Sequence, residues 1–299
     1  MRVVRTPETR FENLPGYSFA PHYFETCGLR IHYLDEGRGE TSFLCLHGEP
    51  TWSYLYRKMI PVLSERGRVI APDLAGFGKS DKPAETKDYT FDFHFAVLSA
   101  LLEHTQARNI VLICQDWGGL LGLPLAMEFE QRFSGLVIMN TGIPDPTTID
   151  WLRPMNIVGS IGFIAWRTFA VTQPDLPVGH IVSAGCWPPL TLATEVRAAY
   201  EAPFPDKIYK AGAEAFPRLV PLSADHPTLP HMQLARARIA RSTLPKLVMF
   251  SNRDPITWSQ HAYFSGLTNV VGDITVENAG HFLQEDKGEE IAREIVRFF

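Results

Sequence analysis

The sequence predicts an α/β protein built on a mostly parallel β-sheet with helices on both faces. Over residues 1–141, short apolar segments of strand length alternate with longer segments of helical periodicity. Most of the strand segments are continuous apolar runs, which is typical of parallel strands buried on both faces. The alternation stops after Thr141 and resumes at Lys246, with a helical, Pro-rich stretch between them. We therefore expect an eight-stranded sheet with a helical cap inserted after its sixth strand.

The first two predicted strands form an antiparallel hairpin that turns at Cys27-Gly28. The eight strands are predicted at Ser18–Glu25, Leu29–Asp35, Ser42–Leu46, Val69–Pro72, Ile110–Cys114, Leu136–Asn140, Lys246–Ser251 and Asp273–Glu277. The helices that cover the sheet are predicted at Trp52–Glu65, Phe91–His104, Leu120–Phe129 and Glu285–Phe299. Two shorter helices are predicted within the cap, at Ile161–Phe169 and Leu192–Glu201. The chain is thereby divided into a first core segment, 1–145, a cap, 146–223, and a second core segment, 224–299.

Length and composition limit the classes of protein that this chain can be. Its 299 residues, 45% of them hydrophobic, suffice for one large domain with an insertion. The formal net charge of −5 and the lack of a basic cluster argue against a nucleic-acid partner. Four scattered cysteines favour neither a zinc site nor a disulfide framework, and neither a signal peptide nor a membrane-spanning run is evident. We expect a cytoplasmic monomer with no metal, cofactor or membrane partner.

The stretch Asn109–Gly122, NIVLICQDWGGLLG, combines a buried strand, a tight turn and a helix, with one acidic residue at the bend. This arrangement resembles the nucleophile elbow of α/β-hydrolases, G-x-S-x-G. Cys114 stands in the place of the first glycine, Asp116 in that of the serine, and Gly118 retains the last glycine. An ionised carboxylate needs no base before it attacks, and its ester at a saturated carbon can later be cleaved by water. We interpret Asp116 as a nucleophile; the alternative is that it only caps the helix.

A covalent aspartyl ester needs a base that activates water and a group that orients that base. His281 lies in a loop between the last strand and the terminal helix, where hydrolases carry the base. Asp254 follows the penultimate strand and is the candidate acid, because the rival position after the sixth strand lacks a nearby carboxylate. Glu285 and Asp286 are closer to His281 in sequence, but they open a helix, where acidic residues are favourable.

Two backbone N–H groups are expected to form an oxyanion hole, that of Trp117 after the nucleophile and that of Glu49 in the loop after the third strand. The side chain of Glu49 is a candidate for holding the hydrolytic water. The indole of Trp117 adds an N–H that donates a hydrogen bond and accepts none. Such a donor suits a leaving group that departs as an anion and needs no proton, as a halide does. The alternative is that Trp117 only packs beneath the cap.

Together with these residues, several segments are similar to haloalkane dehalogenases of the α/β-hydrolase fold. The segments are HGEPTWSYLYR at 47–57, IAPD at 70–73, GFGKSDKP at 76–83 and QDWGG at 115–119. The resemblance implies hydrolysis of small haloalkanes to the alcohol and a halide ion, with water as co-reactant and an aspartyl alkyl ester as intermediate. It assigns Asp116 as the nucleophile, His281 as the base and Asp254 as its acid partner, in the subfamily whose acid follows the penultimate strand.

The resemblance also implies a second halide donor in the cap. The matching context is FIAWR at 163–167, so Trp166 would bind halide together with Trp117. Trp151 and Trp187 also lie in the cap, and the sequence does not rank the three tryptophans firmly. By the same match, the substrate pocket would be lined by Phe163, Phe216, Pro217 and Val220.

Two other functions stay open at this point. An epoxide hydrolase also uses an aspartate at the elbow, with cap tyrosines that protonate the ring oxygen, and Tyr200 and Tyr209 lie in the cap. Trp117 and Trp166 favour halide over an alkoxide that needs a proton. The third alternative is a non-catalytic relative that only binds a ligand, against which the complete set of nucleophile, acid and base argues.

Overall fold

One eight-stranded sheet runs through the computed structural model, which describes residues 1–147, 154–173 and 175–299. Its strands are β2 (His22–Thr26), β3 (Leu29–Glu36), β4 (Ser42–Leu46), β5 (Arg68–Pro72), β7 (Ile110–Gln115), β8 (Phe133–Met139), β9 (Lys246–Ser251) and β10 (Val270–Val276). Their order across the sheet is β10-β9-β8-β7-β4-β5-β3-β2. The strands from β10 to β5 pair in parallel, whereas β3 pairs antiparallel with β5 and with β2. The predicted mostly parallel sheet and its initial hairpin are confirmed.

Burial follows the position of each strand in the sheet. Every residue of the inner strands β4, β7 and β9 is buried. This explains their continuous apolar runs, because both of their faces are covered by helices. The edge strand β10 instead alternates between half-buried and exposed positions over most of its length. A second, two-stranded sheet, β1 (Val3–Val4) with β6 (Lys82–Pro83), was not predicted from the sequence.

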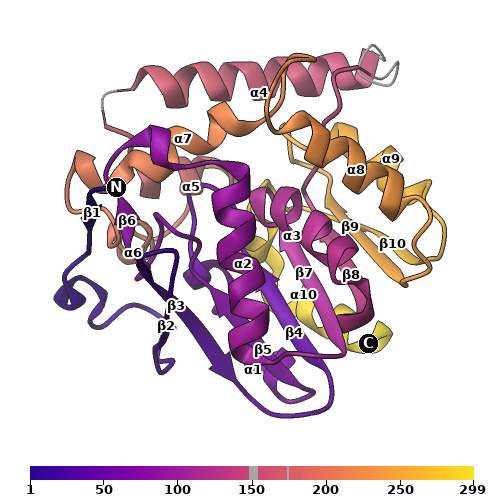
Figure 1. The fold of residues 1–299 in the computed structure, drawn as a ribbon, viewed down its shortest axis with the longest axis horizontal. Helices are drawn as coiled ribbons and strands as arrows, with labels where there is room; N and C mark the ends of the chain where they lie inside the picture. Colours follow the sequence, from indigo (N-terminus) through magenta and orange to yellow (C-terminus); the bar gives the residue numbers. More distant parts are fainter. Residues whose placement is uncertain (148–153, 174) are drawn as a thin grey trace.

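Helices cover both faces of the sheet (Figure 1). They are α1 (Ile60–Ser64), α2 (Phe91–Thr105), α3 (Trp117–Glu128), α8 (Leu229–Ile239), α9 (His261–Ser265) and α10 (Leu283–Phe298). Helix α3 packs against α2 and α8 in front of the sheet, and α1 packs against α10 behind it. Helix α2 begins where the sequence predicts, because the Thr90 side chain accepts a hydrogen bond from the N–H of Phe93.

The single helix predicted at Trp52–Glu65 is wrong. The structure has a 3-10 turn, Ser53–Tyr56, followed by the short helix α1. The N–H of Ser53 donates to Asp73, and the hydroxyl of Tyr56 donates to the carbonyl of Leu46 on β4. These contacts to the strand ends hold the segment against the sheet. They depend on residues distant in sequence, so the helical periodicity of the segment does not reveal them.

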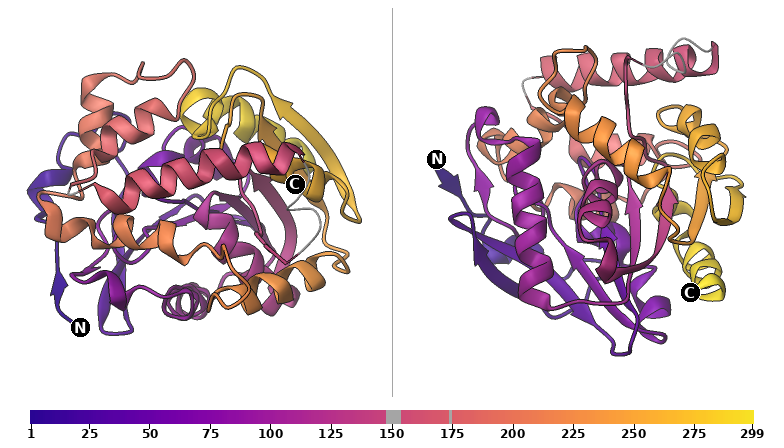
Figure 2. Two further views of the ribbon diagram at one scale, coloured as in Figure 1. Left: turned by 90° about the horizontal axis from the view of Figure 1, so that it is seen from above. Right: turned by 45° about the vertical axis from the view of Figure 1, so that its right-hand side comes forward.

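Four further helices form a layer across the carboxyl ends of the parallel strands, as the views in Figure 2 show. They are α4 (Pro154–Thr172), α5 (Val178–Ala184), α6 (Thr194–Glu201) and α7 (Ala211–Leu219). Within the described residues between β8 and β9 there is no strand, in agreement with a helical insertion after the sixth strand of the sheet. The layer is tied to the core by Tyr200, whose hydroxyl donates to Glu285 at 2.5 Å. No helix in the described part of the chain is long and apolar enough to cross a membrane.

Candidate active site

Asp116 occupies the sharp bend between β7 and α3. Its φ of +52° lies in the left-handed region, which is strained for a residue with a side chain. The bend is possible because two glycines follow: a Cβ at Gly118 would lie 1.9 Å from the carbonyl oxygen of Leu46 on β4. The close approach also makes α3 begin at Trp117, three residues earlier than predicted. This strand–turn–helix is the elbow geometry predicted from the sequence.

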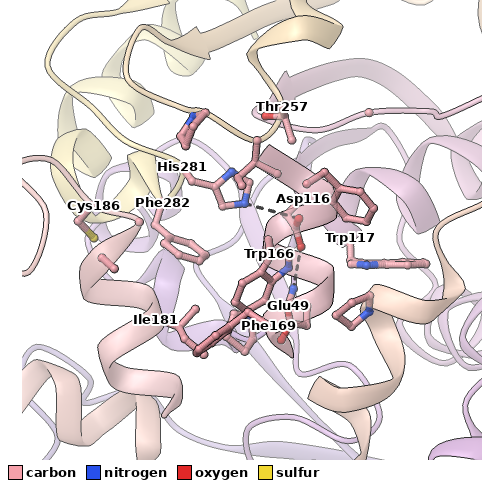
Figure 3. Close-up of a pocket in the computed structure, with 18 of the residues that line it drawn as sticks. Glu49, Asp116, Trp117, Trp166, Phe169, Ile181, Cys186, Thr257, His281 and Phe282 are labelled. Atoms are coloured by element: carbon pink, nitrogen blue, oxygen red, sulfur yellow. Dashed lines mark hydrogen bonds and ion pairs between the residues drawn. The ribbon is translucent and has the colours of Figure 1, made fainter. Parts of the chain in front are cut away.

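The carboxylate of Asp116 does not cap its own helix, so the capping alternative fails. Its Oδ1 instead accepts a hydrogen bond of 2.8 Å from the backbone N–H of Glu49. Its Oδ2 lies 3.5 Å from Nε2 of His281. Figure 3 shows the carboxylate between these two groups. Trp117 is the first residue of α3, and its backbone N–H therefore has no acceptor within the helix.

His281 and Asp254 meet as the sequence predicts, although they come from different loops. Nδ1 of His281 lies 3.1 Å from Oδ1 of Asp254, whose side chain is fully buried. Asp254 also accepts hydrogen bonds from the N–H of Ile256 and from the hydroxyl of Thr257. Burial alone would raise the pKa of Asp254, but the charge of His281 and these hydrogen bonds lower it below its ordinary value. Asp254 therefore stays ionised and can accept a hydrogen bond from the Nδ1–H of the imidazole.

The pKa of His281 is set by competing effects. Burial would lower it, but the charge of Asp254 and the hydrogen bond and charge of Asp116 raise it to about 10. The two carboxylates on either side of the ring thus favour a protonated imidazole in the free protein. Glu49 behaves in the opposite way. Burial and the charge of Asp116 raise the pKa of its carboxyl well above the usual range, and its Oε1 has no hydrogen-bond partner among the described residues.

Asp116 lines a cavity of about 690 Å³ between the sheet and the helices above it. Its wall is mostly apolar, as ligand pockets usually are. Trp117 and Trp166 both contribute to the wall, from α3 and α4 respectively, and lie near Asp116 in Figure 3. No hydrogen bond to either indole N–H occurs among the described residues, so both donors are available to an anion in the cavity. Trp187 also lines the cavity, whereas Trp151 lies outside the described residues.

Three of the four predicted pocket residues, Phe163, Pro217 and Val220, line this cavity. The fourth prediction is wrong, because Phe216 is fully buried and does not reach the wall. Its ring packs edge-on against Trp117 with the centroids 4.8 Å apart, and so supports the indole from behind. Pro217 follows Phe216 on α7, and neighbouring helix positions point in different directions, which a sequence match cannot resolve.

The structure also brings residues to the site that the sequence analysis did not single out. Those that line the cavity include Phe169, Ile181, Cys186, Leu190 and Phe282. Gln115, the residue before Asp116, contacts the ring of His281. Its position at a strand end beside the elbow is the one signal that could have identified it. Within the described part of the chain, no three His, Cys, Asp or Glu side chains converge as metal ligands would.

The epoxide-hydrolase alternative needs tyrosines in the cavity. Tyr200 is fully buried, its hydroxyl donates to Glu285, and it is not among the residues that line the cavity. Tyr209 packs against the core and is not part of the wall. No tyrosine is found among the described residues that line the cavity. The site therefore offers indole N–H donors to a leaving group but no acidic hydroxyl of tyrosine.

Comparison with known proteins agrees with this geometry. Residues 41–158 match the family described as alpha/beta hydrolase fold. A haloalkane dehalogenase of Psychrobacter cryohalolentis is 44% identical over 308 aligned residues, which cover all of this chain and 98% of that protein. A haloalkane dehalogenase of Mycolicibacterium paratuberculosis is also 44% identical, over 99% of this chain and 98% of its own length.

Solved structures lead to the same family. The tetrameric haloalkane dehalogenase DpaA from Paraglaciecola agarilytica NO2 has a TM-score of 0.89 and 37% identity, over 100% of this chain and 99% of DpaA. Identity at this level over the whole length, together with the shared fold, establishes the family. The chain belongs to the haloalkane dehalogenases of the α/β-hydrolase fold, hydrolases that act on carbon–halide bonds.

Proposed function

We propose that the chain hydrolyses haloalkanes in two steps, through an alkyl ester on Asp116. The observation that carries the proposal is the setting of this carboxylate, which faces a mostly apolar cavity and is held by one backbone N–H. Its Oδ2, which accepts no backbone hydrogen bond, attacks the halogen-bearing carbon. The new C–O bond forms as the carbon–halogen bond breaks, and the halide leaves with the electron pair. Oδ1 becomes the ester carbonyl oxygen, polarised by the N–H of Glu49.

The departing halide is bound by two indoles in this proposal. Trp117 and Trp166 line the cavity, and their N–H groups are free of acceptors among the described residues. A halide carries its full charge only after the bond breaks, so these donors stabilise the transition state more than the substrate. The packing of Phe216 behind Trp117 holds the first donor in place.

In the second step His281 takes a proton from water, and the water oxygen adds to the ester carbonyl carbon of Asp116. The backbone N–H groups of Glu49 and Trp117 donate to the resulting oxyanion. Collapse breaks the acyl C–O bond, and the alkoxide leaves as alcohol with the proton from His281. Asp116 then ionises and releases one proton to solvent. The carboxyl of Glu49, buried beside Asp116, is suited to hold the attacking water.

Ester formation also prepares the base. The charge of Asp116 is one of the two that raise the pKa of His281. A neutral ester removes this charge and its hydrogen bond, so the pKa of the imidazole falls at the stage where the ring must accept a proton. Asp254 keeps the remaining proton on Nδ1 throughout.

The proposal extends to the partners and organisation of the protein. A small halogenated alkane, halide and water are its only ligands, with no cofactor, nucleic acid or membrane, and the protein acts as a monomer in the cytoplasm. The relative DpaA is a tetramer, so sedimentation velocity is the measurement that tests the monomer. We propose residues 146–223 as the cap over the two core segments, 1–145 and 224–299.

The experiment uses His281→Gln, which removes the base and leaves the nucleophile. Mixed with 1,2-dibromoethane, this variant should release one equivalent of bromide and stop. Mass spectrometry should then find a bromoethyl adduct on the peptide that contains Asp116. Asp116→Asn is the matched control and should give neither bromide nor adduct. An unmodified His281→Gln protein that continues to release bromide would contradict the proposal.

A further inference from the structure

Gln115 is the last residue of β7, and its side chain is buried in contact with His281. Its amide nitrogen lies 3.2 Å from the backbone carbonyl oxygen of His281. The same nitrogen lies 3.0 Å from Nε2 of the His281 ring. The two steps proposed above use Asp116, Asp254 and the ring itself, but assign nothing to this amide.

The carbonyl of His281 determines which way the amide points. A carbonyl oxygen accepts hydrogen bonds only, so the NH₂ end of Gln115 has to face it. The opposite orientation would bring two oxygens together without a proton between them. Asn140 provides a consistent neighbour: its NH₂ group donates to the same carbonyl at 3.1 Å, while its Oδ1 accepts from the N–H of Ser251. The second lone pair of the carbonyl is therefore left for Gln115.

The orientation of the amide in turn determines the state of the imidazole. With nitrogen facing the ring, Gln115 can only donate, so Nε2 of His281 has to carry a lone pair. The ring proton is then on Nδ1, which faces Asp254 at 3.1 Å. This is the neutral tautomer that a base needs when it removes a proton from water.

We propose that Gln115 is a positioning residue for His281, whose amide N–H donates to Nε2 and favours the neutral ring at the ester stage, when the charge of Asp116 is gone, until the water's proton takes over that lone pair. The inference rests on the proposed two-step function. The charged and titratable groups that face the ring are Asp116 at the elbow, Asp254 after β9 and Glu49 after β4. Asp286, on α10, accepts from the N–H of Gly280 next to the base.

When ionised, these four carboxyl groups attract a proton to His281, and when neutral they carry no positive charge that would repel the imidazolium. The amide of Gln115 acts against them, because a donor beside Nε2 destabilises an imidazolium and stabilises the neutral ring. Loss of this donor should therefore raise the pH at which His281 loses its proton. A hydrogen bond of ordinary strength corresponds to a rise of about 0.5 to 1 pH unit.

The test compares Gln115→Met, which keeps the length of the side chain and removes its donor, with Ser251→Ala. Ser251 donates to the carbonyl of Gly280 in the same loop at 2.6 Å, but its hydroxyl is not hydrogen-bonded to the ring. The measured quantity is the rate constant of ester hydrolysis in single turnovers across pH, separated from the preceding halide burst. Gln115→Met should move the acidic limb of this profile up by about 0.5 to 1 unit, with about 3- to 10-fold slower hydrolysis below it. Ser251→Ala should leave the midpoint of the limb where it is.

Equal midpoints in wild type and Gln115→Met would overturn the inference, as would an equal shift in Ser251→Ala. If Gln115→Met does not fold, the ring of His281 in the wild-type protein is observed by long-range ¹H–¹⁵N NMR, assigned from its absence in His281→Gln. At a pH above the acidic limb, where the ring is neutral, its one proton should be on Nδ1, which faces Asp254, and Nε2 should be unprotonated. A proton on Nε2 at that pH would overturn the inference. Failure of the two-step function would appear separately, as no halide burst in wild type.

Discussion

Replacing Gly48 by alanine should displace the carboxylate of Asp116 and so slow its attack on the substrate, although Asp116 itself is unchanged. An added Cβ would lie 2.2 Å from Oδ1 of Asp116, and Cβ contacts shorter than 3.0 Å are essentially never found. The two residues must therefore separate by about 0.8 Å. The backbone of Asp116 is held on both sides, since its N–H donates to Asn140 and its carbonyl accepts from Thr141. The carboxylate has to rotate away from the N–H of Glu49, and a displacement near 1 Å lowers the rate by about 100-fold.

Pre-steady-state halide release is the assay, because it reports the attack of Asp116 separately from hydrolysis. The control is Gly28→Ala in the hairpin, where an added Cβ meets nothing within 4 Å. Since φ at Gly28 is +74°, this variant should lose about 1 kcal/mol of stability and keep its burst rate. A burst in Gly48→Ala within about 3-fold of wild type would refute the reasoning, since a 1 Å displacement should cost far more.

Three further predictions concern halide binding and stability. Trp117→Phe and Trp166→Phe each remove one donor to an anion, a bond of about 1.5–3 kcal/mol, and should weaken product inhibition by bromide at least about 10-fold. Arg57→Met leaves Glu285 buried without its guanidinium partner and should cost about 3–5 kcal/mol in urea unfolding. Because the pKa of Asp254 is lowered in the folded state, its ionisation stabilises the protein above the ordinary value of 3.8. The stability advantage of wild type over Asp254→Asn should therefore shrink as the pH falls below this ordinary value and through the lowered pKa of the folded state.

Each of these predictions has an outcome that would contradict it. Unchanged bromide inhibition in Trp166→Phe would mean that this indole does not donate to the halide. Trp187, which lines the same cavity, would then be the next candidate donor. Wild-type stability in Arg57→Met would mean that Glu285 is neutral when buried. A difference between wild type and Asp254→Asn that stays constant as the pH falls below the ordinary value of 3.8 would mean that the pKa of Asp254 is not lowered by folding.

The positions of the three residues that we propose as catalytic could be predicted from the sequence because they depend on chain order and strand position alone. Asp116, Asp254 and His281 each follow a parallel strand, and the carboxyl ends of such strands meet at one edge. The inner strands β4 and β9 were predicted to the residue, since burial on both faces leaves a continuous apolar run.

The remaining details depend on side-chain direction and on partners far away in sequence. Phe216 is apolar and on a cap helix, but whether it faces the cavity or supports Trp117 depends on how α7 is rotated. Glu285 was interpreted as a favourable charge at a helix N-terminus, yet its carboxylate is buried and paired with Arg57, 228 residues away. Gln115 carries no recognisable chemistry by itself. Its significance depends on the ring and carbonyl of His281, which only the fold brings to it.

The origin of the oxygen in the product alcohol tests the two-step mechanism most directly. Wild-type enzyme in excess over a haloalkane is allowed one turnover in H₂¹⁸O. Because the alcohol leaves with an oxygen of Asp116, the alcohol should contain ¹⁶O, and the peptide that carries Asp116 should gain one ¹⁸O. Alcohol that contains ¹⁸O after a single turnover would mean that water attacks the substrate itself, and would contradict the ester at Asp116.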